Sequence, residues 1–224
     1  MTAPPPPPGP VEARILGLVH EVFDTGDLQA AALTPLLKGR SAAFILLAHA
    51  EIEYALEVAC HKVSGLLRKS SDPAVTMLAW GFLLAKSGGE TPKLSPKSTP
   101  VADLATAYDA MLDANNGIKE KNLQNLLVPI GVDMGLLKTE MLVLDGFGAR
   151  RGDLAHKPLS SWSTPDLPSA HVGSAVQAGH AADQIVAAID DKHSAIAPGS
   201  ARPRRAWRKR IATFLRRLAD FVER

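Results

Sequence analysis

The sequence predicts an almost wholly α-helical protein with one core domain and a tail at each end. Of its 224 residues 46% are hydrophobic but only 5% are aromatic, and Ala and Leu recur throughout while runs of β-branched residues are scarce. This composition favours helix, because β-branched and aromatic residues are the ones that pack best in sheets. A chain of this length buries one sizeable core, so we expect a single helical domain over residues 11–195.

The two ends of the chain differ from this domain. Residues 1–10 contain five consecutive prolines and predict a flexible, proline-rich arm with nothing to pack. After a linker over residues 196–206, apolar side chains recur at helical spacing among arginines, which predicts a basic amphipathic helix over residues 207–224. Residues 201–224 hold nine Arg or Lys and two acidic residues, so the basicity of the chain belongs to this tail.

Two helices are expected in the first part of the domain. Apolar residues at 11–23 follow a helical spacing, and Gly26 and Gly39 mark the connector that follows. Ser41 is the expected N-cap of a long helix that ends near Arg68. The apolar face of this long helix consists of Phe44, Leu47, Ala48, Ile52, Ala55, Leu56, Ala59 and Val63.

Five further helices are expected in the rest of the domain. Residues 87–100 contain two glycines and three prolines and predict a loop, Asn115-Asn116-Gly117 predicts a turn, and Pro158 ends the core helix that carries the motif described below. Glycines within that core helix, at 146, 148 and 152, are expected to weaken or kink it. The five helices are expected over residues 73–84, 101–112, 118–128, 136–157 and 170–189.

Several classes of protein do not fit these patterns. The most apolar stretch, residues 42–60, is interrupted by four ionisable side chains, so we expect no membrane span, and without a secretory signal pattern we expect a cytoplasmic protein. The single cysteine, Cys60, has apolar neighbours and is expected to be a small buried side chain. No glycine motif follows a strand and no His-Glu-x-x-His is present, so we expect neither a nucleotide cofactor nor a metal.

The most informative motif lies within residues 144–157, where Arg151 and His156 are separated by four residues. Arg150 also fits, with five residues before His156. This motif resembles that of the HEPN superfamily, in particular its RiboL-PSP-HEPN and related nuclease branches. Two other segments add to the resemblance: the run Leu-Leu-Ala-His-Ala-Glu-Ile-Glu in the long helix and the segment Gly-Ile-Lys-Glu-Lys-Asn-Leu from Gly117. The resemblance covers residues 11–189 and implies a HEPN-like helical bundle.

The resemblance implies an endoribonuclease that needs no metal and leaves 2′,3′-cyclic phosphate and 5′-hydroxyl ends. His156 suits the base that takes the 2′-hydroxyl proton, because an imidazole has a pKa of about 6.5. Arg151 suits the cation that holds the phosphate, since its planar fork donates to two oxygens. Five residues along a helix separate two side chains by about 140° around its axis, so we expect a homodimer whose paired helices complete one cleft.

The sequence departs from the family at Gly152, where a polar residue, commonly asparagine, often stands. Asp153 is a candidate supporting residue that orients His156 or an arginine, as Arg150 is a candidate second cation. The departure leaves open a non-catalytic HEPN module that binds RNA or protein, and a His156 that only caps its helix. The remaining histidines, among them His49, have weaker claims, and the alternate glutamates of the long helix are interpreted as a solvated face.

The basic tail leaves three interpretations. Its cations are candidate RNA-binding residues, namely Arg204, Arg205, Arg208, Lys209 and Arg210. Alternatively, the helix over residues 207–224 lies on an anionic membrane surface, or its apolar stripe packs on the protein's own core or dimer partner. A further hypothesis is a helical adaptor that uses this basic tail to hold a membrane or a partner. The expected partners are RNA, a second copy and an antitoxin or regulatory protein, because members of the family serve as toxins and defence effectors.

Overall fold

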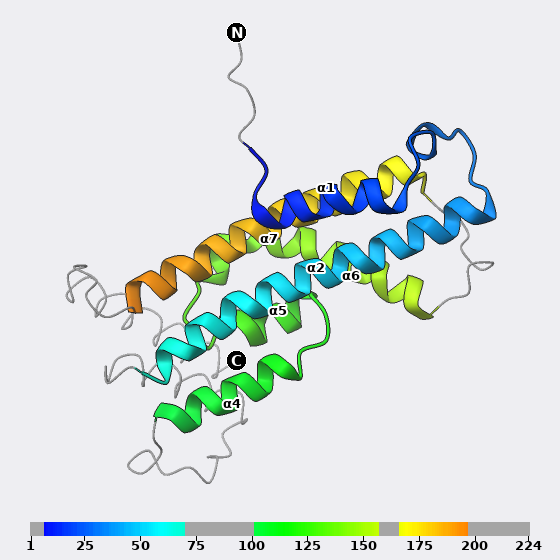
Figure 1. The fold of residues 1–224 in the computed structure, drawn as a ribbon. Coiled ribbons are helices and arrows are strands. Elements are labelled where there is room, and N and C mark those ends of the chain that lie inside the picture. Colours follow the sequence, from blue (N-terminus) through cyan, green and yellow to red (C-terminus); the bar gives the residue numbers. More distant parts are fainter. Residues whose placement is uncertain (1–6, 70–100, 157–165, 197–224) are drawn as a thin grey trace. The chain divides into compact units, whose positions relative to one another are not determined.

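A computed structural model of the chain describes residues 7–69, 101–156 and 166–196 (Figure 1). Over these ranges the regular elements are helices without any strand, which confirms the predicted all-α class. None of the helices there is both long and apolar enough to cross a membrane. The elements are α1 (Pro10–Val22), η1 (Asp27–Gln29), α2 (Pro35–Leu67), α4 (Val101–Asp113), α5 (Glu120–Leu127), η2 (Met134–Leu137), α6 (Lys138–His156) and α7 (Pro168–Ile196).

Some predictions lie outside the described residues. These are the helix after Asp72-Pro73, most of the proline-rich arm, and the tail with its amphipathic helix over residues 207–224. They stay predictions.

The predicted start of the long helix is wrong. α2 begins at Pro35, so both Ser41 and Gly39 lie inside it. The N-cap is Thr34, whose Oγ1 accepts a hydrogen bond of 3.2 Å from the Leu37 amide, and Pro35 takes the first helical position, where its missing N–H costs nothing. Ser41 is instead fully buried among apolar side chains, because the helix continues through the glycine that we had taken for a break.

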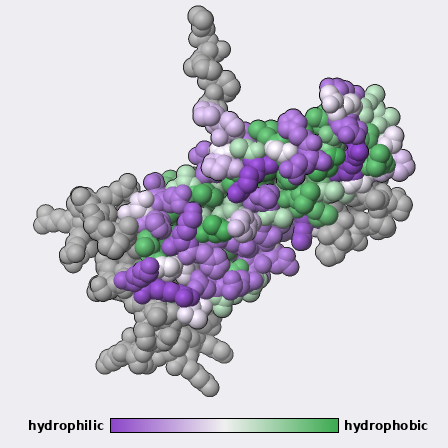
Figure 2. All heavy atoms as spheres, viewed as in Figure 1, coloured by the Kyte–Doolittle hydropathy of each residue, from purple (hydrophilic) through white to green (hydrophobic). Residues whose placement is uncertain are grey.

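Contacts within the chain define two compact units, and both α2 and α7 contribute residues to each. The first unit is formed by Met1–Val58, Asn116–Gln124 and Gly135–Ala187. The second is formed by Ala59–Asn115, Asn125–Met134 and Ala188–Arg224. On the face drawn in Figure 2, polar side chains cover much of the described surface with apolar ones between them.

The first unit packs α1 alongside α7 and against the first half of α2 (Figure 1). A Cβ on Gly179 of α7 would lie 2.7 Å from Ile15 Cδ1 and 3.1 Å from Glu12 Cα, so the glycine permits the close approach of α1. Phe23 and Phe44 stack at a tilt with 5.4 Å between ring centroids. The largest fully buried side chains of this unit are Ile15, Phe44, Ile45, Ile52, Leu56, Ile118, Leu123, Leu144 and Ile185.

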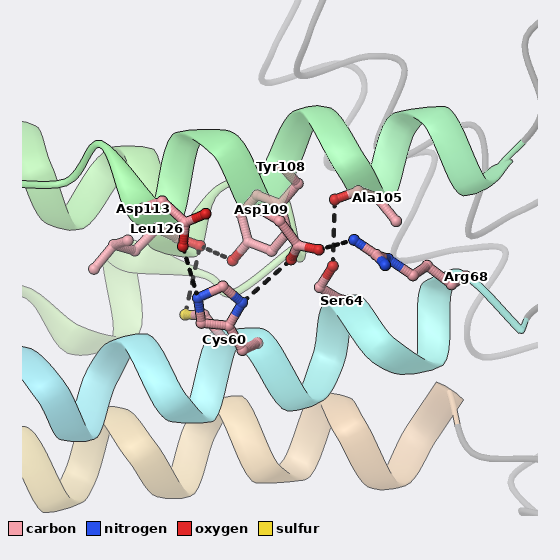
Figure 3. A network of polar contacts seen from close by, with 9 residues as sticks. Cys60, Ser64, Arg68, Ala105, Tyr108, Asp109, Asp113 and Leu126 are labelled. Carbon is pink, nitrogen blue, oxygen red and sulfur yellow. Dashed lines mark hydrogen bonds and ion pairs between the residues drawn. The ribbon is translucent and has the colours of Figure 1, made fainter.

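The second unit joins the end of α2 to α4 through polar contacts (Figure 3). The Leu126 carbonyl accepts a hydrogen bond of 2.6 Å from the Tyr108 hydroxyl, and the Cys60 thiol lies 3.8 Å from the same oxygen. Cys60 is fully buried, as predicted. Asp109 of α4 pairs with His61 of α2 and with Arg68, which directly follows this helix, and the two ion pairs tie α2 and α4 together at their solvent-facing side.

Candidate functional site

Helix α6, which carries the predicted motif, runs unbroken through the three glycines that we expected to weaken or kink it. Gly148 has a packing role. A Cβ at this position would lie 3.3 Å from both Ile118 Cγ1 and Lys119 Cγ, in the segment that leads into α5. The glycine therefore allows the two segments to come together closely.

A pocket of about 370 Å³ lies where this segment, α6 and α2 meet within the first unit. Two cationic side chains and one imidazole line it, beside several glycines that leave backbone accessible. The lining residues are His49 from α2, Asn116, Gly117, Ile118 and Lys119 from the segment before α5, and Gly148, Ala149, Arg151 and Gly152 from α6. The size falls at the lower end of the range typical of small-ligand sites.

The two adjacent arginines of the motif have different surroundings. Arg151 is partly buried and lines the pocket. Arg150 is exposed, and its guanidinium lies 3.7 Å from the Asp166 carboxylate. The sequence did not rank the two, but of these two arginines only Arg151 lines the pocket.

Hydrogen bonds fix the pocket edge that Gly117 and Lys119 form. Gly117 has a φ of 114°, which favours glycine, and its amide donates to the Glu53 carboxylate. The Asn122 side-chain amide donates to the Asn116 carbonyl at 2.7 Å. At the start of α5, the Glu120 amide donates to the Asp145 carboxylate of α6 at 3.0 Å, which satisfies an N–H that the helix leaves unpaired.

His49 lies at the inner wall of the pocket with only 3% of its side chain exposed. Its ring is roughly parallel to that of Phe147, with 6.5 Å between centroids and 21° between planes. Nδ1 lies 3.6 Å from a Glu53 carboxylate oxygen, and Nε2 lies 4.0 Å from where a Cβ on Gly117 would stand. One nitrogen therefore faces a carboxylate and the other faces the pocket edge.

The surroundings of His49 oppose its protonation. Burial, helped by the nearby Arg151 guanidinium, lowers the pKa of His49 to about 4, so the imidazole is neutral at pH 7. Burial raises the pKa of Glu53, and the Glu57 carboxylate adds to this, while the Gly117 amide and Arg151 act in the opposite direction. The site thus holds a fixed cation next to a proton acceptor, an arrangement suited to binding an anion and taking up a proton.

The other predicted site residues are placed as follows. The backbone of α6 includes Asp153 and His156, but their side chains lie outside the described residues. The RNA-binding candidates of the tail also lie outside them. Across the ranges that are described, no group of three His, Cys, Asp or Glu side chains is placed to hold a metal ion.

Sequence reasoning missed Glu53, Lys119 and the importance of His49. The interpretation of the glutamates of α2 as a solvated face is wrong for Glu53, whose side chain is only 20% exposed and binds the Gly117 amide. A signal was present in the sequence, since His49 stands in register with Ile45, Ile52 and other residues of the buried face of α2. A polar residue in such a row marks a polar site within the core.

Comparison with protein-family models, with curated proteins and with solved structures gives no match for this chain.

Proposed function

We propose that the protein is a metal-independent endoribonuclease of the HEPN type, and that the pocket of the first unit receives the scissile phosphate. The observation that supports this most strongly is the position of Arg151. The arginine of the predicted motif lines a pocket together with a second cation, Lys119, and an imidazole. Arginine and lysine side chains converging on one small cavity favour an anionic ligand such as a phosphodiester.

In the proposed reaction the RNA 2′-oxygen attacks the adjacent phosphorus while the bond to the 5′-oxygen breaks. The Arg151 guanidinium donates to two phosphate oxygens and stabilises the charge that develops on them, and Lys119 adds a second positive charge at the pocket edge. Proton transfer needs one group that takes the 2′-hydroxyl proton and one that gives a proton to the leaving oxygen. His156, at the last residue of α6, is the group that the motif offers for one of these steps.

The proposal includes a homodimer. Because α6 is one helix from Lys138 to His156, positions 151 and 156 are five residues apart on it, which corresponds to about 140° around its axis. Such a pair does not converge on one phosphate within a single helix. A second copy related by two-fold symmetry supplies the complementary residue to each cleft.

A non-catalytic RNA-binding module is the second candidate, and Gly152 favours it. This residue lines the pocket at the position where the family often has a polar side chain. A site that keeps Arg151 and Lys119 but lacks that polar group would still bind phosphate. The two candidates share the ligand and differ in whether the phosphodiester is cleaved.

The test is incubation of the purified full chain with mixed RNA in EDTA. We expect the wild type to cleave RNA and to leave 2′,3′-cyclic phosphate ends. Arg151→Ala is expected to lower the cleavage rate about a hundredfold or more, as loss of a group that stabilises transition-state charge typically does. Arg150→Ala, the matched control on the adjacent residue, is expected to stay within about threefold of the wild type because Arg150 is exposed beside Asp166.

Each result separates the candidates. Binding of RNA without cleavage by the wild type would favour the binding module. Equal losses in Arg150→Ala and Arg151→Ala would contradict the assignment of the phosphate site to the pocket. Cleavage that EDTA abolishes would contradict the metal-independent mechanism.

A further inference from the structure

We infer that His49 is a catalytic residue of this site, that its Nε2 accepts the 2′-hydroxyl proton of the RNA, and that Glu53 positions it. The inference rests on the proposed nuclease function and adds a residue from α2, about a hundred positions away from the motif in the sequence. It gives His156 the complementary step, in which a proton is given to the 5′-oxygen. His49 thus takes the role of base that the motif alone suggested for His156, and His156 becomes the acid.

The geometry of the ring carries the inference. Nδ1 faces the Glu53 carboxylate at 3.6 Å, longer than a hydrogen bond but within the range of an ion pair. Nε2 is on the side of Gly117, a residue that lines the pocket and whose lack of a side chain keeps this side of the ring open. The negative charge of Glu53 on the Nδ1 side favours a proton on that nitrogen, which leaves the lone pair of Nε2 on the side of the pocket.

Glu53 is itself held in place from the other side. Its carboxylate accepts a hydrogen bond from the Gly117 amide, and its side chain is mostly buried. The same carboxylate therefore connects the ring of His49 to the pocket edge. When the imidazole takes a proton, the neighbouring negative charge stabilises the imidazolium that forms.

Burial, with the nearby Arg151 guanidinium, makes His49 a proton acceptor and not a donor in the free protein. The charged groups that face it are Glu53 from α2, Arg151 from α6 and Lys119 from the segment before α5, and the Glu53 carboxylate acts against the lowering of the pKa of His49. A neutral imidazole beside a fixed cation has a free lone pair at neutral pH. An RNA phosphate bound between Arg151 and Lys119 offsets their charge, so proton uptake by His49 becomes easier when the substrate is present.

The step balances as an acid–base transesterification. The 2′-O–H bond breaks as Nε2 takes the proton, the 2′-oxygen forms a bond to phosphorus, and the bond from phosphorus to the 5′-oxygen breaks. The leaving oxygen takes a proton from the His156 imidazolium or from water. The products are a 2′,3′-cyclic phosphate and a 5′-hydroxyl.

The first experiment compares the pH dependence of RNA cleavage by the wild type, His49→Gln and His49→Ala. Glutamine fills the space but takes up no proton, and we expect it to lower the rate about a hundredfold or more and to abolish the acidic limb of the profile. We expect added imidazole to restore part of the activity of His49→Ala. The control is His180→Gln, because His180 is an exposed histidine that pairs with Glu12 and does not line the pocket, and it should cleave as the wild type does.

The second measurement does not depend on activity. Wild-type protein labelled at its histidines is titrated by NMR, and the His49 signal is assigned by its absence from His49→Gln. Inorganic phosphate, or a dinucleotide with a 2′-deoxy sugar that cannot be cleaved, should shift this signal and move its titration to higher pH. Glu53→Gln should reduce this shift, which a purely structural role of Glu53 would leave unchanged.

The outcomes distinguish the two levels of the proposal. Cleavage by His49→Gln at the wild-type rate and pH profile would overturn the role of His49 and leave the nuclease standing. A His49 signal that saturating phosphate does not move would overturn it as well. Absence of cleavage by the wild type in every preparation would overturn the nuclease function and this inference with it.

Discussion

At the scale of single residues, the pocket keeps an imidazole uncharged beside a guanidinium. His49 is almost fully enclosed, and Arg151 lies close enough to oppose its protonation. Burying an ionisable group in its neutral form costs little at pH 7 but becomes costly when the group must be charged. The burial of His49 therefore lowers the stability of the folded protein only at acidic pH.

This cost predicts a pH dependence of stability. The pKa of His49 is about 4 in the folded protein, against about 6.5 for an exposed imidazole, so the unfolded chain binds the proton more readily. The free energy of unfolding that comes from a neutral, buried His49 is fully present above about pH 6.5 and is lost as the pH falls from about 6.5 towards 4. By pH 4.5 the loss of stability is about 2 kcal/mol. Urea unfolding of the wild type and of His49→Gln at pH 7.5 and pH 4.5 measures it.

In His49→Gln the loss of stability with acid should be smaller than in the wild type by that amount. His180→Gln is the control, since its side chain is 60% exposed and should leave the acid response of the wild type unaltered. If the wild type and His49→Gln lose the same stability between the two pH values, His49 is not buried in its neutral form.

At the scale of elements, backbone amides at the starts of two helices, α1 and α5, donate hydrogen bonds to side chains of a different helix. The amides of Val11 and Glu12 at the start of α1 donate to the two carboxylate oxygens of Asp183 in α7, at 2.9 and 3.0 Å. A side chain on Gly9 would collide with this carboxylate, so the glycine keeps the cap in place. Asp145 of α6 caps α5 in the same way. Such caps fix one helix relative to another as well as ending it.

Replacing Asp183 with alanine should therefore weaken the attachment of α1 to α7. Two amides at a partly buried helix end lose their acceptors, and we expect the free energy of unfolding to fall by about 1–2 kcal/mol. Asp190→Ala, at an exposed position of the same helix, should change it by less than about 0.5 kcal/mol. Urea unfolding followed by circular dichroism compares the two, and equal effects would mean that the cap contributes nothing.

At the scale of the whole molecule, the question is whether a complete cleft needs two chains. The unbroken helix α6 places Arg151 and His156 on different sides of its axis, whereas Arg151, Lys119 and His49 line one pocket of one chain. The pocket is thus formed within one chain, and in the proposed dimer only the contribution of His156 has to cross between copies.

Mixing two inactive variants tests this arrangement. The Arg151→Ala and His156→Ala variants are unfolded together and refolded. Half of the dimers that form should contain one chain of each variant, and in such a dimer one of the two clefts has both Arg151 and His156. We expect about a quarter of the wild-type cleavage rate to return. Each variant refolded alone is the control. Light scattering that shows only monomers in active wild-type protein, or mixtures that stay inactive, would contradict the composite cleft.

Local sequence patterns were enough to predict most helix bounds and to single out Arg151. Apolar spacing, turn residues and helix propensity act over a few residues, so α1, α4, α5 and α6 begin and end close to where these patterns place them. The start of α2 was predicted wrongly because one glycine inside a helix costs only about 1 kcal/mol of stability. The Thr34 cap and the buried face of this helix outweigh that cost.

Which polar residues line one pocket depends on how distant parts of the chain pack together. His49, Lys119 and Arg151 lie far apart in the chain, and no local pattern brings an imidazole from α2 to the arginine of α6. Their convergence depends on packing: Gly148 lets α6 approach the segment before α5, and the left-handed backbone of Gly117 turns its amide to Glu53. Side-chain types specify what a site can do, whereas long-range packing of the buried faces decides whether the site exists.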